Sequence, residues 1–177
     1  MKYKQVYLSL GGNQGDVLGQ LNKALHELRT SAEVFNLKHS HFYATSALNT
    51  THPSLFVNMI CSFETLLSPV KVFECTQIIE KKLGKQPKPK NADRPIDIDI
   101  IFYDQQQYCS TELEIPHPRW QNRLFVLVPL RDLIAQIWLE IKGESFQFKI
   151  DDLIKEVSLK DPGQAIRLLE KNIFLNI

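Results

Sequence analysis

The segment "RPIDIDIIFYD", which begins at Arg94, constrains the fold more than any other part of the sequence. Its isoleucines alternate with Asp97 and Asp99, which is the period of a β-strand. The two carboxylates therefore share one face of the predicted strand, about 7 Å apart, and the isoleucines face a core. Like charges at this spacing repel each other unless a cation or a basic group lies between them.

Length and composition describe an ordinary globular domain. The chain has 177 residues, of which 44% are hydrophobic and 23% charged, and we expect a single domain over residues 1–177. Its core should span about 5–138, with C-terminal additions over 139–177. The formal net charge of +1 argues against nucleic-acid binding, and no apolar run is long enough to cross a membrane.

The N-terminus and the cysteines predict a cytoplasmic protein. The first ten residues enter strand-like alternation directly, without the apolar stretch of a signal peptide. Cys61, Cys75 and Cys109 are odd in number and far apart, so free thiols are expected rather than disulfides or a zinc site. No obligate protein partner is evident.

The order of predicted elements gives the fold class. A strand over 5–10 ends at the turn "GGNQGD", and Asp16 caps a helix with apolar positions at helical spacing. Strands over 37–45 and 56–65 follow, and Ser68 with Pro69 opens a second helix that ends near Gly84. With the acidic strand, this predicts an α+β, ferredoxin-like β-α-β-β-α-β core.

The C-terminal third predicts additions to that core. The segment "STELEIPHP" should form a strand beside the acidic strand, and "VLVPLRDLIAQIW" a helix with Pro129 near its first turn. The segment "IKGESFQFKI" has the pattern of a hairpin, and Asp151 or Asp152 should cap a short helix. A last helix is expected in "DPGQAIRLLEKNI".

The carboxylate pair suits Mg²⁺, which prefers carboxylates combined with substrate phosphates. Arg94 can reach the same phosphates with its planar guanidinium, and Lys85, Lys88 and Lys90 lie in the preceding loop, which should be exposed and mobile. The alternative is a solvated face of an edge strand whose acids pair with nearby lysines. The two interpretations are about equally supported by these residues.

Other candidate binding residues have equally plausible structural roles. The turn "GGNQG" lacks the lysine of a nucleotide-binding P-loop, so a structural turn held by Asn13 is favoured. The default interpretation of Phe56 and Phe125 is that they pack in the core. The alternative is that a flat heterocycle binds between the two rings and that Asn58 hydrogen-bonds its edge. Gln77 and Glu80, three residues apart on a helix, bind a polar ligand or simply face solvent.

Together these segments resemble the 6-hydroxymethyl-7,8-dihydropterin pyrophosphokinase family of folate biosynthesis. The resemblance covers roughly residues 7–133 and rests on "YLSLGGNQGD", "FYATSAL", "FVNMICSFET" and, most specifically, "DRPIDIDIIFYD" followed by "IPHPRWQNRLFVLVPL". The resemblance implies a transferase that moves the β,γ-pyrophosphate of ATP to the pterin hydroxymethyl group and releases AMP. ATP and the pterin would then be its small-molecule partners.

The resemblance also implies residue roles. Asp97 and Asp99 would bind two Mg²⁺ ions, Arg94 would contact phosphates, and Lys85 stands where the family usually has a mobile arginine. The pterin-side residues would be Thr45, Leu48, Phe56, Asn58 and Phe125, and the nucleotide-side residues would be Gln77, Glu80, Ile98, His117 and Arg123.

Two differences from the family pattern stand out. Asn91 replaces a tryptophan and Pro118 a tyrosine that some members have. Two alternatives remain open, a Mg²⁺-dependent phosphoesterase or nuclease that uses the same aspartates, and a ferredoxin-like binding module without catalysis.

Overall fold

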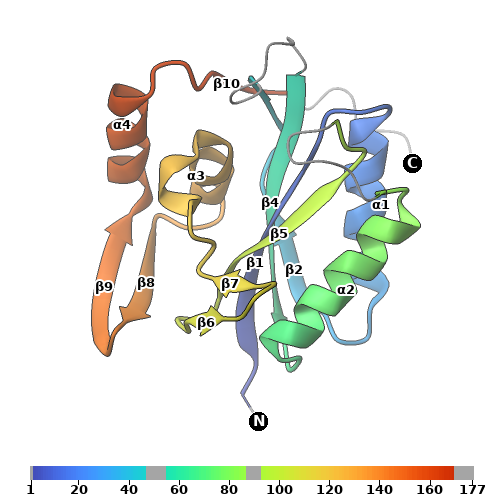
Figure 1. Cartoon of the computed structure of the whole chain (residues 1–177), viewed down its shortest axis with the longest axis horizontal. Coiled ribbons are helices and arrows are strands. Elements are labelled where there is room, and N and C mark those ends of the chain that lie inside the picture. The colour runs from blue at the N-terminus through green and yellow to red at the C-terminus, as the bar shows by residue number, and fades with distance from the viewer. Residues whose placement is uncertain (1, 47–54, 87–92, 170–177) are drawn as a thin grey trace.

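The computed structural model describes residues 2–46, 55–86 and 93–169. Its centre is β1 (Lys4–Gly12), which lies between β4 (Leu55–Thr65) and β5 (Asp97–Tyr103) in an antiparallel sheet. The sheet order is β10-β3-β4-β1-β5, and β2 (Phe35–His39) also pairs with β4 (Figure 1). β5 is therefore an edge strand, so the acidic residues at its start are reachable from outside the sheet.

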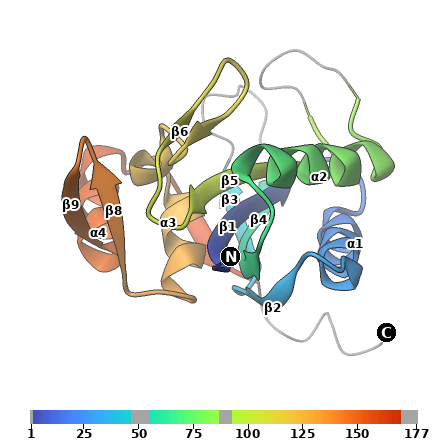
Figure 2. The same ribbon diagram turned by 90° about the horizontal axis from the view of Figure 1, so that it is seen from below.

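Helices α1 (Val17–Thr30) and α2 (Pro69–Lys82) cover one face of the sheet (Figure 2). Both predicted caps are confirmed, since Asp16 Oδ1 accepts from the Gly19 N–H at 2.9 Å and Ser68 Oγ accepts from the Lys71 N–H. The apolar stripe of α1 is buried as its spacing predicts. These helices enclose the first core together with Ile96, which precedes β5, and with Ile98 and Ile100 of β5.

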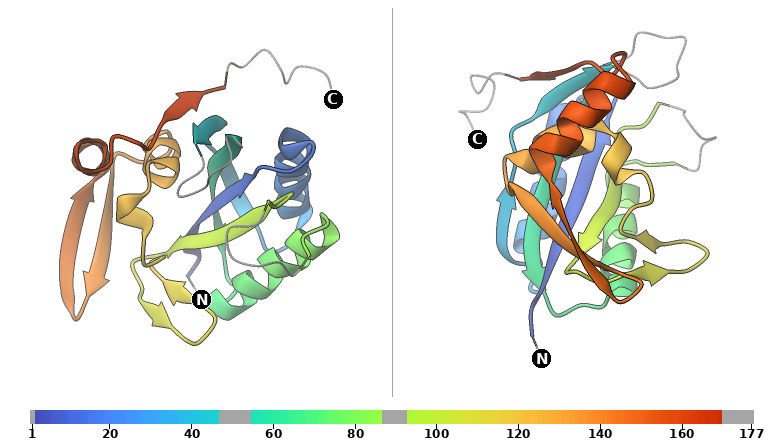
Figure 3. Two further views of the ribbon diagram at one scale, coloured as in Figure 1. Left: turned by 45° about the horizontal axis from the view of Figure 1, so that its top comes forward. Right: turned by 90° about the vertical axis from the view of Figure 1, so that its left-hand side faces the viewer.

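The opposite face is partly covered by the C-terminal third of the chain. Helix α3 (Leu124–Arg131), the hairpin of β8 (Gln136–Ile141) and β9 (Glu144–Lys149), and α4 (Ile150–Lys160) pack there, beside the sheet (Figures 1 and 3). Their apolar residues form a second core with Ile60, Ile101 and Phe102 of the sheet. Two cores therefore share one sheet, and Asp97 and Asp99 lie on the face of the second core.

Several predicted elements differ from the structure. Residues 37–45 are not one strand, because buried Ser40 ends β2 and its hydroxyl accepts the Ile60 N–H at 3.0 Å before β3 (Tyr43–Ser46) begins. The segment expected beside β5 instead forms β7 (Glu114–Ile115), which pairs with β6 (Tyr108–Cys109) in a separate small sheet. The segment still makes a backbone hydrogen bond to β5, in which the His117 N–H donates to the Ile101 carbonyl at 3.0 Å.

The C-terminal helices are also corrected. Helix α3 begins at Leu124, so Pro129 lies near its end, and the last residues of the predicted helix form β8 because Ile137 and Leu139 alternate into the second core. The hairpin is confirmed, whereas Asp151 and Asp152 lie in the first turn of α4 without capping it. The expected last helix contains a strand, β10 (Ile166–Leu168), which pairs with β3.

The cysteines and the helix lengths bear on two further predictions. Cys61, Cys75 and Cys109 are free thiols, as expected. In the described ranges, every helix is too short or too polar to cross a membrane.

Candidate active site

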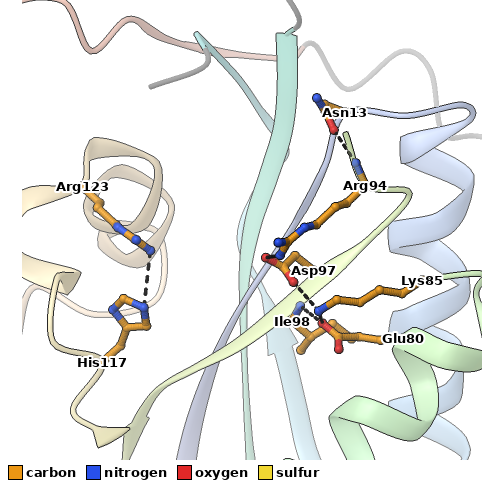
Figure 4. A network of polar contacts seen from close by, with 8 residues as sticks. All are labelled: Asn13, Glu80, Lys85, Arg94, Asp97, Ile98, His117 and Arg123. Atoms are coloured by element: carbon orange, nitrogen blue, oxygen red, sulfur yellow. Dashed lines mark hydrogen bonds and ion pairs between the residues drawn. The ribbon is translucent and has the colours of Figure 1, made fainter. Parts of the chain in front are cut away.

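The first group of site residues surrounds Asp97 at the free edge of β5 (Figure 4). Lys85 Nζ donates to Asp97 Oδ1 at 2.5 Å, and Arg94 Nη1 donates to Asp97 Oδ2 at 3.0 Å. Lys85 also contacts Glu80 Oε1 at 2.6 Å. The sequence placed these residues in one region, and the structure joins Lys85, Arg94, Asp97 and Glu80 in one network of ion pairs.

Glu80 is buried because it completes the hydrogen bonding of the sheet edge. Its Oε1 accepts the Ile98 N–H at 2.6 Å, and this N–H points away from β1 at the free edge of β5. Burial raises the pKa of the Glu80 carboxyl, and Lys85 and the Ile98 N–H counter this effect only in part. Burial opposes the charge of Lys85, but Asp97 and Glu80 outweigh it and raise the pKa of Lys85.

Arg94 is held by the glycine turn that follows β1. Asn13 Oδ1 accepts the Arg94 N–H at 2.8 Å, and the Arg94 carbonyl accepts the Asn13 N–H at 3.0 Å. Gly12 allows this approach, since a Cβ there would lie 2.5 Å from the Pro95 carbonyl oxygen. Asn13 therefore holds the loop as predicted, but of the turn's glycines only Gly15, with φ +71°, uses the left-handed conformation.

Asp99 lies beside Asp97 on the same face of β5. Burial raises the pKa of Asp99, and so does the charge of Asp97, while Arg123, Lys85 and Arg94 act in the opposite direction. The three cations therefore do not outweigh burial and the charge of Asp97 at Asp99. This charge balance fits a divalent cation, and no third His, Cys, Asp or Glu among the described residues completes a protein cage. Two neighbouring carboxylates outside a complete protein cage suit Mg²⁺ that is shared with phosphates.

A second group lies across the sheet from Asp97. Asn58 on β4 and Asp97 on β5 are both register partners of Gly11 on β1. A Cβ at Gly11 would lie 2.2 Å from Asn58 Oδ1, so the glycine makes room for this amide. Asn58 Nδ2 donates to Thr45 Oγ1 at 2.7 Å, and both side chains are buried.

A third group lies at the start of α3. The guanidinium of Arg123 lies 5.2 Å from the centre of the Phe125 ring and 3.4 Å, at Nη1, from His117 Nε2. Burial first, and then Arg123 and Arg119, lower the pKa of His117 to about 4, so this imidazole is neutral at pH 7. Burial and Arg119 lower the pKa of Arg123, while Asp99 and Asp97 oppose them.

Other predicted residues are less connected. Gln77 is exposed on α2, whereas Glu80 on the same helix is buried. Phe56 is half-buried opposite Thr45 in the sheet register. Leu48, Lys88, Lys90 and Asn91 lie outside the described residues.

Sequence reasoning missed two features of the site. Gly11 gave a usable signal, because a glycine inside a strand pattern often marks a close approach of another group. The hydrogen bonds from Gln164 to the start of α3 left no signal in the sequence, because they join residues about 40 positions apart.

The sequence is similar to proteins of one known family. Residues 7–135 match the model of the family described as 7,8-dihydro-6-hydroxymethylpterin-pyrophosphokinase. The sequence is 34% identical over 131 residues to the 2-amino-4-hydroxy-6-hydroxymethyldihydropteridine pyrophosphokinase of Bacillus subtilis, and this match covers 74% of this chain and 78% of the relative. It is 39% identical over 138 residues to the enzyme of that name from Porphyromonas gingivalis, covering 76% of this chain and 92% of the relative.

A solved structure supports the fold. The Plasmodium falciparum HPPK-DHPS structure with SDX-DHP superimposes with a TM-score of 0.68 and 16% identity, over 90% of this chain. This chain spans only 45% of that longer protein, and at this identity the likeness concerns the fold alone. The family match and the two bacterial relatives carry the assignment, and the chain belongs to the 7,8-dihydro-6-hydroxymethylpterin-pyrophosphokinase family.

Proposed function

We propose that the protein transfers the β,γ-pyrophosphate of ATP to the hydroxymethyl group of 6-hydroxymethyl-7,8-dihydropterin and releases AMP, as a step in folate biosynthesis. The observation that carries this proposal is the pairing of Asp97 with Lys85 and Arg94 next to the half-buried Asp99. Two cations and two carboxylates at one sheet edge provide the groups that bind a polyphosphate together with its metal.

The nucleotide would bind along the edge of β5. Arg94 offers a guanidinium whose backbone Asn13 already fixes, and Lys85, just after α2, offers a point charge. Asp97 and Asp99 would hold Mg²⁺, with two ions proposed, and the metal would neutralise charge on the transferring phosphates. Glu80, Ile98, His117, Arg123 and the exposed Gln77 would lie on the nucleotide side.

The pterin would bind on the same face, across β1. Asn58, oriented by Thr45, would hydrogen-bond the edge of the heterocycle, and Phe56 and Phe125 would lie against its two faces. The backbone near Thr45 and Leu48 would close this side. Because Asn58 and Asp97 flank Gly11 in register, the acceptor and the phosphates would meet above β1.

Catalysis would depend on positioning and charge neutralisation. The hydroxymethyl oxygen attacks the β-phosphorus, the bond to the α-phosphate oxygen breaks, and AMP leaves with the electron pair of that bond. The hydroxyl proton is released as the new bond forms. Arg94 and Lys85 stabilise negative charge that develops on the transferred group, and no covalent enzyme intermediate is needed.

The finer assignments are part of the same proposal. The sheet order β5-β1-β4-β3, all antiparallel, supports a ferredoxin-like core. A single pyrophosphokinase domain over 1–177, with its core at about 5–138, is supported by the second core, in which Leu139, Ile150 and Val157 of the C-terminal additions pack with apolar residues from the range 43–137. A cytoplasmic location and the absence of an obligate protein partner stay predictions.

One assay distinguishes this function from the alternatives. The protein is incubated with ATP, Mg²⁺ and the hydroxymethyl dihydropterin, and AMP and the pterin diphosphate are quantified. Equal amounts of both products support the proposal. AMP formation that does not depend on the pterin indicates a hydrolase, and the absence of turnover together with ligand binding indicates a binding module.

A further inference from the structure

The segment at 164–168, here called the C-terminal tether, contacts both sides of the site although it lies beyond the region that matches the family model. Its first residue, Gln164, bonds to the turn that precedes α3. Its last three residues form β10, the dark red strand in Figure 3. In the register of β10 with β3, Ile166 pairs with Thr45 and Leu168 with Tyr43. The tether therefore joins the strand that carries Thr45 to the segment that carries Arg123 and Phe125.

Gln164 binds the backbone on both sides of Arg123. Its Oε1 accepts the Leu124 N–H at 2.9 Å, and its Nε2 donates to the Asn122 carbonyl at 3.0 Å. Nε2 also donates to Asp161 Oδ2 at 3.0 Å. One amide side chain thus fixes the peptide groups before and after residue 123, as a neighbouring strand does.

This contact replaces a helix cap that α3 lacks. Leu124 is the first residue of α3, so its N–H has no partner within the helix, and the Arg123 side chain does not cap it. The Arg123 carbonyl accepts from Val126 and Leu127 at 3.0 Å, so residue 123 is the junction between the turn and the helix. An uncapped start of α3 would let this junction, and the direction of the Arg123 side chain, vary.

The orientation of the Arg123 side chain matters for the site. Its guanidinium lies over the Phe125 ring, next to His117, and it interacts electrostatically with Asp99 and Asp97. We propose that Gln164 is a positioning residue that fixes Arg123 and Phe125 relative to the carboxylate pair. This inference rests on the proposed function, and it assigns a catalytic purpose to the C-terminal additions.

The test compares the wild type with Gln164→Ala, Gln147→Ala, Arg123→Ala and the double variant Arg123→Ala/Gln164→Ala. Gln147 is a matched control, because its exposed amide bonds to Gln136 within the β8–β9 hairpin and contacts neither side of the site. We expect Gln164→Ala to lower kcat/KM about tenfold, because small misplacements of a binding group are costly to the rate. Gln147→Ala should stay within about twofold of wild type.

The double variant separates positioning from a general structural role. If Gln164 acts through Arg123, the double variant should be as active as Arg123→Ala alone, within about twofold. If Gln164→Ala lowers kcat/KM by the same factor in both backgrounds, the inference is overturned. A Gln164→Met variant keeps the length of the side chain and loses both backbone hydrogen bonds, so it guards against misfolding of the alanine variant; a loss of about tenfold is expected here too, and wild-type activity of Gln164→Met would overturn the inference.

Amide exchange at Leu124 provides a readout that does not need activity. We expect exchange at least about tenfold faster in Gln164→Ala than in the wild type or Gln147→Ala, because the N–H loses its only described acceptor. Unchanged exchange overturns the inference even if the enzyme is active. A wild type that forms no AMP overturns the proposed function alone.

Discussion

Lys85 Nζ lies 2.5 Å from Asp97 Oδ1, so the mobile cation expected to meet phosphate is paired with the carboxylate expected to hold metal. The same ammonium group contacts Glu80, which in turn accepts the N–H of Ile98 beside Asp97. Without substrates, Lys85 is therefore held by two carboxylates of the site, Asp97 and Glu80. Binding of ATP with its metal would exchange these pairs for contacts with phosphate.

The first prediction concerns Lys85. Lys85→Ala should lower kcat about 10²-fold, because one donor to the developing charge is lost, and Lys85→Arg should recover most of it because a cation is retained. AMP formation under saturating substrates measures both. Lys82→Ala is the control, since Lys82 also ends α2 in an ion pair, with Glu27, but lies outside the site. Equal activity of the two alanine variants would contradict the role given to Lys85.

The second prediction concerns the metal. Asp97→Asn should lower turnover at least about 10²-fold at any Mg²⁺ concentration, because an amide oxygen is a much weaker ligand than a carboxylate. Asp104→Asn makes the same chemical change just after the other end of β5, where Asp104 pairs with Lys4 near the surface. It should keep near-normal activity. Near-normal turnover by Asp97→Asn would show that the metal assignment is wrong.

A third prediction tests the close approach at Gly11. Gly11→Ala should destabilise the fold by about 2 kcal/mol, because the added Cβ overlaps the Asn58 amide, and it should weaken pterin binding. Adding Asn58→Ala removes the overlapping group, so the double variant should regain part of the stability but none of the pterin affinity. Chemical denaturation measures the first quantity and calorimetric titration the second. No gain in stability in the double variant would rule out the overlap as the cause.

The fourth prediction is a pH dependence of stability from His117. Its pKa is about 4 in the folded protein and 6.5 ordinarily, because of burial and the neighbouring Arg123 and Arg119. As pH falls from 6.5 to 4, the unfolded chain binds a proton that the folded protein does not, so stability decreases. Since the ring is partly exposed, we expect an effect of about 1 kcal/mol.

Thermal unfolding from pH 4 to 7 measures this effect. His117→Gln should show a smaller loss of melting temperature on acidification than the wild type. His26→Gln, at an exposed position on α1, should follow the wild-type curve. Identical pH profiles for His117→Gln and wild type would exclude His117 as the source.

The part of the fold that was predictable depends on short-range interactions. Asp16 and Ser68 cap α1 and α2 because a cap needs only the next few residues, and the alternation of β5 is visible in seven letters. The segment around Ile166 has apolar residues that suit a helix equally well, and its pairing with the edge of β3 decides for a strand. Such tertiary pairing leaves no local pattern.

The same distinction between short-range and tertiary interactions applies to the candidate site. The acids of β5, Arg94 and Lys85 are close in sequence, so the sequence alone predicts that they lie together. That Gln77 faces solvent while Glu80 turns inward depends on the angle at which α2 meets the edge of β5. That Gln164 reaches Arg123 depends on the path of α4 and the strand after it, which no motif specifies.

The two cores on opposite sides of the sheet have an evolutionary consequence. The sheet acts as a partition, since the apolar residues of α1 pack on the side away from the carboxylates, whereas α2 also carries Glu80 at the free edge of β5. Stability can then drift in one compartment while the chemistry of the other is preserved. Descendants of such a protein are free to acquire new thermal limits without rebuilding the surface that handles substrates.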